Sequence, residues 1–162
     1  MMIDAVRAYL ALLKEPPPTA REAVRALART LDRLSLAYHE TLAVVVEDDN
    51  EPPALASYDE LRALAVRAFP DFGFYAVARP HEVPPSDALL GDAIDDLADI
   101  ARDLIEVEWR WLNNGPVDAV WQFRWGYQSH WGQHLLDLRR YVHACQFEGD
   151  RRLEPPVDGL EP

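Results

Sequence analysis

Apolar side chains recur every three or four positions over most of this chain, with polar and charged residues between them. An α-helix has 3.6 residues per turn, so this spacing places the apolar side chains along one face of each helix. The pattern predicts helices at about 3–13, 19–45 and 57–69. Two longer helices follow, one from residue 86 or 87 to about 112 and one from 116 to about 147.

Prolines and capping sequences mark the ends of these helices. The run Pro16-Pro17-Pro18 ends the first helix, because proline has no backbone N–H and restricts the residue before it. Thr19 and Ser57 are each followed three residues later by glutamate, which is the capping-box pattern of a helix start. Pro70 ends the third helix, and Pro116 is suited to the first turn of the last.

Two segments have no helical period. Residues 70–86 contain several aromatic residues and prolines and are expected to form a long irregular loop, and residues 148–162 an extended or disordered tail. No alternating strand pattern is evident elsewhere. The sequence therefore predicts an all-α protein, an antiparallel bundle of four to five helices in one domain at 1–147.

Composition narrows the classes of partner. The 162 residues have a formal charge of −12, which repels phosphate backbones and anionic lipid headgroups and argues against nucleic acid and membrane surfaces. No apolar run approaches the roughly twenty residues that a membrane-spanning helix needs. Cys145 is the single cysteine and forms no internal disulfide, which fits a cytoplasmic protein.

One charge of each sign interrupts the apolar stripes of the last two helices, Glu108 in the first and Arg124 in the second. A short connection makes these helices antiparallel, so the two residues come within about one turn of each other in height. Since either charge alone is costly to bury, we expect a partly buried ion pair between them. The pair either fixes the register of the helices or binds a ligand.

A sharper chemical pattern is the pair His130 and His134, which lie one helical turn apart and point the same way. The antiparallel arrangement places them level with Asp99 and Asp95, and Asp96 lies on the matching flank of its helix. Imidazole and carboxylate ligands in a bundle groove suit divalent zinc, manganese or iron.

The candidate metal ligands are thus Asp96, Asp99, His130 and His134, with Asp92 or Asp103 as further members of the shell. The alternative is a solvated acidic face with two histidines packed beside Trp131. Which of the two holds depends on whether the flanks face each other, that is, on the handedness of the bundle, which the sequence does not fix.

Trp109 and Trp125 lie well off the apolar stripes, about 120° from the core direction. Two such large aromatic side chains require a covering surface. Either the aromatic segment 69–75 packs over one of them, or they form a contact surface for a second subunit or another protein.

Three strings in the C-terminal half are unusual together: DDLADIxxDL at 95–104, WxFRW at 121–125 and HWGxH at 130–134. With them the chain resembles a bacterial family, the domain of unknown function numbered 5063, and the likeness is concentrated in residues 87–145. The resemblance implies an all-α bacterial domain. It brings no activity, cofactor or partner.

Two functions from different classes fit these observations. The leading hypothesis is a non-catalytic helical protein that self-associates or joins a larger assembly through Trp109 and Trp125, since no nucleophile and base pair is evident. The alternative is a small metal-dependent, hydrolase-like enzyme. Its site would lie between the last two helices, with Asp96 and both histidines as ligands and Glu108 or Asp99 as general base.

Overall fold

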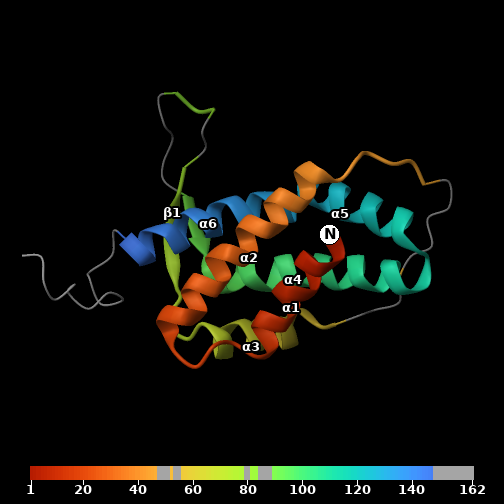
Figure 1. Ribbon diagram of the computed structural model, residues 1–162. Coiled ribbons are helices and arrows are strands. Elements are labelled where there is room, and N and C mark those ends of the chain that lie inside the picture. The colour runs from red at the N-terminus through yellow and green to blue at the C-terminus, as the bar shows by residue number, and fades with distance from the viewer. Residues whose placement is uncertain (47–51, 53–55, 79–80, 84–88, 148–162) are drawn as a thin grey trace, which may run out of the picture.

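The structure is a computed structural model that describes residues 1–46, 52, 56–78, 81–83 and 89–147. Within these residues the chain forms six helices and one two-stranded sheet, which confirms the predicted all-α bundle (Figure 1). The elements are α1 (Met2–Lys14), α2 (Ala20–Glu40), α3 (Tyr58–Ala68), β1 (Phe74–Val77), β2 (Leu89–Asp92), α4 (Ala93–Asn113), α5 (Pro116–Ser129) and α6 (Trp131–Phe147).

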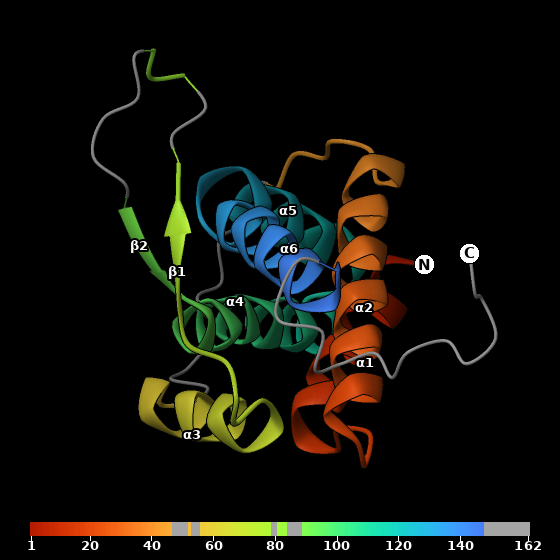
Figure 2. The same cartoon turned by 90° about the vertical axis from the view of Figure 1, so that its left-hand side faces the viewer.

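Helix α4 lies at the centre of the bundle. It contacts α1, α3, α5 and α6, and Figure 2 shows the other helices arranged around it. Such a position requires apolar residues over a wide part of the helix circumference, and α4 provides them in Ile94, Ala98, Leu104 and Val107, all of which are buried. Helix α4 is therefore a rigid support for side chains that project from its remaining face.

The two N-terminal helices pack on this centre. Tyr9 of α1 is fully buried and donates a hydrogen bond from its hydroxyl to the carbonyl of Leu97 at 2.9 Å, which joins α1 to α4. Helix α2 ends at Glu40, earlier than the predicted residue 45, and the apolar side chains of Leu42 and Val45 beyond it are exposed.

The predicted irregular loop at 70–86 contains a strand, so this prediction is wrong in part. β1 pairs antiparallel with β2, with Tyr75 opposite Gly91. The segment that was expected to begin the following helix is β2, and α4 begins only at Ala93, where the Asp92 side chain accepts a hydrogen bond from the Ile94 N–H at 3.0 Å. Ser86 and Asp87, the expected caps, lie outside the described residues.

The predicted single helix at 116–147 is two helices, and this raises the number above the expected four to five. The chain breaks at His130, whose backbone angles (φ −148°, ψ −84°) are not helical. Directly after the break Trp131 turns into the core, fully buried against Phe123 and Tyr127 with ring centroids 4.9 and 5.0 Å away. Gly132 permits the close approach at this break, because a Cβ atom there would lie 2.0 Å from the carbonyl oxygen of Tyr127.

None of the helices in the described part of the chain combines the length and the apolar character needed to cross a membrane. The tail predicted at 148–162 falls beyond the described residues.

Candidate metal-binding site

Two aspartate–histidine pairs lie between α4 and the start of α6. His134 Nδ1 lies 2.7 Å from Asp96 Oδ1, and His130 Nδ1 lies 2.8 Å from Asp103 Oδ2. The earlier histidine pairs with the later aspartate, so α4 and the α5–α6 segment run in opposite directions. The predicted flanks therefore do face each other, and the handedness that the sequence left open brings the histidines and the aspartates together.

These contacts determine which nitrogen of each imidazole carries a proton. An ionised carboxylate only accepts hydrogen bonds, so Nδ1 of both His130 and His134 must donate. In a neutral imidazole the other nitrogen, Nε2, then has a free lone pair. A carboxylate that holds one ring nitrogen while the other faces an ion is the usual arrangement of metal-bound histidines in proteins.

Asp99 is the third member of the cluster. One ring nitrogen of His130, one of His134 and a carboxylate oxygen of Asp99 all lie within 4.8 Å of one another. His134 Nε2 is 3.9 Å from Asp99 Oδ2. Around an ion with bonds of about 2.1 Å, tetrahedral ligand atoms are about 3.4 Å apart, so small side-chain movements would close the set.

Tyr75 of β1 also enters the site, and its hydroxyl donates a hydrogen bond to Asp96 Oδ2. Asp96 is buried, and both of its oxygens accept hydrogen bonds, Oδ2 from Tyr75 and Oδ1 from His134. Burial, and then the hydrogen bond to Asp96, raise the pKa of the Tyr75 hydroxyl, which therefore remains a donor. Tyr75 lies in the segment predicted as an irregular loop, so the helical pattern does not indicate this role. The run Phe-Tyr-Ala-Val, which contains strand formers, is the signal in the sequence.

The electrostatics of the site are dominated by carboxylates. The hydrogen bond to Asp96 raises the pKa of His134 above its usual value, against the opposing effect of burial. Burial and neighbouring aspartates raise the pKa values of Asp95 and Asp137. Several perturbed groups in one place are typical of functional sites, and the negative potential they create attracts a cation.

The other predicted members of the shell have different roles. Asp103 Oδ2 lies 2.8 Å from His130 Nδ1 and is therefore placed behind a candidate ligand. Asp92 is occupied as the N-cap of α4 and lies 3.5 Å from Arg62. Asp99 Oδ1 pairs with Arg102 at 3.1 Å, which leaves Oδ2 toward the histidines.

The predicted ion pair between Glu108 and Arg124 is wrong. Glu108 Oε1 accepts from Arg7 Nε of α1 at 2.9 Å. Arg124 Nη1 donates to the carbonyl oxygen of Tyr38 at 2.9 Å and to that of Thr41. The expected pair follows from the relative heights of residues on the last two helices alone. The N-terminal helices pack against both of them and provide closer partners.

Trp109 is half-buried, and Trp125 is 53% exposed and stacks on Trp121 with centroids 6.1 Å apart. The aromatic segment at 69–75 covers a different residue. Phe72 and Tyr75 both pack on the Tyr141 ring of α6, at 5.3 and 4.9 Å. The contact surface proposed for the tryptophans stays a prediction.

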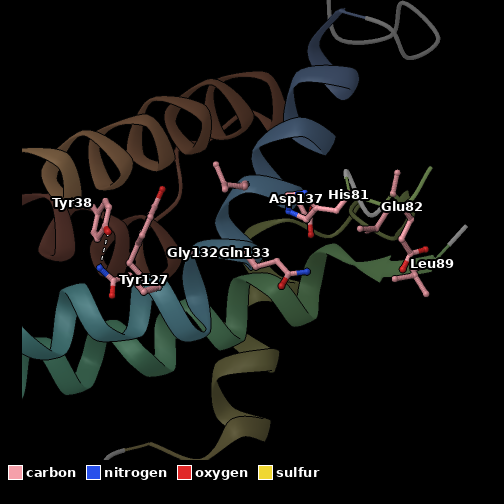
Figure 3. A pocket seen from close by; sticks show the side chains of 12 residues that line it. Tyr38, His81, Glu82, Leu89, Tyr127, Gly132, Gln133 and Asp137 are labelled. Atoms are coloured by element: carbon pink, nitrogen blue, oxygen red, sulfur yellow. Dashed lines mark hydrogen bonds between the residues drawn. The ribbon is translucent and has the colours of Figure 1, made fainter. Parts of the chain in front are cut away.

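A groove of about 710 Å³ borders the site (Figure 3). Gln133 and Asp137 line it, and they flank His134 in the same turns of α6. Figure 3 shows Tyr38 and Tyr127 at one end of the groove and His81, Glu82 and Leu89 at the other. Asp99, His130 and His134 do not line this groove, but its residue Asp137 interacts electrostatically with His134, and the groove is large enough for a small molecule.

Comparison with known families agrees with this architecture. The model of one family, described as a domain of unknown function (DUF5063), matches residues 1–148. The chain belongs to this family. DUF5063 thus includes both the central helix and the two histidines, and the resemblance seen in the C-terminal half extends over the N-terminal half as well.

Among solved structures, this DUF5063 chain is similar to protein BF1032 from Bacteroides fragilis, a structural genomics target. The TM-score is 0.73 with 18% sequence identity, and the match covers 93% of each chain. At this identity the likeness concerns the fold. No curated protein matches the chain.

Proposed function

We propose that this protein binds a divalent transition-metal ion through Asp99, His130 and His134 and is a metal-dependent enzyme. The observation that supports it best is that an aspartate outside the proposed ligand set lies behind each histidine. Asp96 and Asp103 each lie within hydrogen-bond distance of an Nδ1 atom, which leaves both Nε2 atoms free to coordinate. A solvated acidic face would not need this pairing.

The ligand set suggests the kind of metal and chemistry. Two imidazoles and one carboxylate suit zinc or iron, and three protein ligands leave at least one coordination position for water or substrate. A metal held in this way lowers the pKa of a bound water toward neutrality and so supplies a nucleophile for hydrolysis. The adjacent groove provides space for a substrate.

Glu108 is not a candidate for the general base. It pairs with Arg7 and lies nine residues from Asp99 along α4, about 13 Å in the direction of the helix axis. Asp99 is better suited to the role of a ligand, because its Oδ2 atom faces His134.

The test is metal content and metal affinity of untagged protein. Purified protein loaded with Zn²⁺, Mn²⁺ or Fe²⁺ and freed of excess ion should retain about one equivalent of one of them. His130→Ala and His134→Ala should each abolish retention, while the control His143→Ala, an exposed histidine of the same helix α6, should not. Wild-type protein that retains no ion from any of the three overturns the proposal.

A second candidate function is protein association through α5. Val117, Trp121 and Trp125 follow one another at four-residue spacing on this helix, and Val117 and Trp125 are 57% and 53% exposed. An apolar stripe of this kind is typical of a protein contact surface. Light scattering at high concentration should give a mass above one chain, reduced by Trp125→Ala; a single-chain mass at every concentration contradicts self-association.

A further inference from the structure

We infer that Tyr75 is a positioning residue for the metal site, and that through it the docking of the β1–β2 hairpin raises the metal affinity. The inference rests on the proposed function, because it concerns how His134 is held for coordination. It concerns the hairpin, however, which contains none of the three proposed ligands.

The Tyr75 ring has a defined place on the hairpin. Gly91 lies opposite Tyr75 in the antiparallel register. A Cβ atom at position 91 would lie 2.7 Å from Tyr75 Cζ and 2.9 Å from Val77 Cγ2. Glycine at 91 therefore leaves room for the tyrosine ring to lie across β2, and any larger residue would displace it.

Helix α6 fixes the Tyr75 ring from another direction. The rings of Tyr75 and Tyr141 are stacked, with centroids 4.9 Å apart and planes inclined by 22°. The Tyr141 hydroxyl accepts a hydrogen bond from the Gly73 N–H at 3.4 Å, just before β1 begins. Tyr75 is thus in contact with both β2 and α6, which gives its hydroxyl a single direction, toward Asp96.

The hydroxyl completes the hydrogen bonding of a buried carboxylate. Asp96 Oδ2 accepts from Tyr75 and Oδ1 from His134, so neither oxygen can turn away without losing a bond. A carboxylate held at both oxygens keeps the imidazole in one orientation, with Nδ1 protonated and Nε2 toward Asp99. Without Tyr75, Asp96 and His134 gain freedom that metal binding must then remove.

Such coupling is reciprocal. If the docked hairpin increases metal affinity by a given factor, the bound metal stabilises the docked hairpin by the same factor. We therefore expect Zn²⁺ to slow amide hydrogen exchange in β1 and β2 in the wild-type protein. The same ion should give no such protection in Tyr75→Phe.

Tyr75→Phe is the first variant, because it removes the hydroxyl and retains the stacked ring. We expect its Zn²⁺ affinity to fall about ten-fold or more, the usual effect of losing a group behind a metal ligand. The control Tyr127→Phe also removes one tyrosine hydroxyl, but this hydroxyl contacts Ser35 of α2 and not the hairpin, so the affinity should stay nearly unchanged. Nitrogen NMR of the metal-free protein should show His134 protonated at Nδ1 in the wild type and a mixture of tautomers in Tyr75→Phe.

Gly91→Ala is the second variant. It tests whether β2 affects metal affinity through the position of the Tyr75 hydroxyl. It should lower Zn²⁺ affinity by a factor similar to that of Tyr75→Phe, and the double variant should be no weaker than Tyr75→Phe alone. The inference is overturned if the losses of Zn²⁺ affinity in the two single variants add up in the double variant, or if wild type and Tyr75→Phe have equal affinities. Neither result contradicts the proposed metal site. Absence of Zn²⁺ binding in the wild type overturns the proposed function instead.

Discussion

Arg110 and Asp118 form a buried ion pair across the turn between α4 and α5, with Arg110 Nη1 at 3.0 and 3.2 Å from the two carboxylate oxygens of Asp118. Both side chains are almost entirely buried. Asn114 of the connecting turn adds a third contact, its Nδ2 donating to Asp118 Oδ2 at 2.6 Å. The pair holds the two helices together at the end of the bundle where the turn reverses the chain.

Removal of the carboxylate should therefore be costly. Asp118→Ala removes two hydrogen bonds from a buried guanidinium, which keeps Glu106 Oε1 at 2.9 Å from its Nε, and we expect the free energy of unfolding to fall by about 3 kcal/mol. Urea denaturation measures the change. Asp32→Ala is the matched control, since it breaks the exposed pair with Arg139 and should cost less than about 1 kcal/mol. Equal losses in the two variants would contradict the assigned role of the buried pair.

The break between α5 and α6 depends on a close approach at Gly132. A Cβ atom there would lie 2.0 Å from the carbonyl oxygen of Tyr127, which is backbone and cannot move aside. Gly132→Ala should destabilise the protein by about 3 kcal/mol or more, measured by thermal or urea unfolding. Gly73→Ala serves as the control, because a Cβ at Gly73 meets nothing within 4 Å, and it should change stability little. A neutral Gly132→Ala would mean that the two helices can join differently.

The Asp96 contact gives the stability of the metal-free protein a defined pH dependence. The pKa of His134 is raised in the folded protein, so the folded state binds this proton more tightly than the unfolded chain does. The stabilisation is complete below the unfolded value of 6.5 and is lost as pH rises through the higher folded pKa.

With a chelator present, the stability advantage of wild type over His134→Gln should be larger at about pH 5.5 than at about pH 9, two values on either side of the transition. Urea midpoints at the two values measure it. An advantage that grows with pH would contradict the direction of the shift.

Asp103 offers a test of the site that leaves the three ligands in place. Asp103→Ala removes the acceptor of His130 Nδ1, and metal affinity should fall by about 10–100-fold. Asp32→Ala removes the same charge from an exposed position and should have little effect on titration with Zn²⁺. If both variants lose affinity equally, the effect is general electrostatics and not the orientation of His130.

The helical boundaries that local chemistry sets were predicted well. The side chains of Thr19 and Ser57 accept from the backbone N–H groups of Glu22 and Glu60, as the capping boxes indicated. Pro116 begins α5. These features depend on residues within one turn of each other, so the sequence itself contains the necessary information.

The strands and the break at His130 were not predicted, because both depend on distant contacts. The segment 74–77 becomes a strand by pairing with 89–92, and it is held over α6 by Tyr141. The helix breaks at His130, whose Nδ1 lies 2.8 Å from Asp103 of α4, and the helix that follows packs on α4 and α2. Intrinsic propensity does not determine such outcomes, since tertiary packing overrides it.

The sequence by itself determined the all-α class, the family and a set of aspartates and histidines at matching heights on two antiparallel helices. Only the tertiary structure decided that their flanks face each other, that Tyr75 joins Asp96, and that Glu108 and Arg124 take partners from the N-terminal helices. The physical reason is that helical periodicity fixes the direction of a side chain relative to its own helix. Its neighbour is fixed by how the helices pack, which depends on the shape of the whole core.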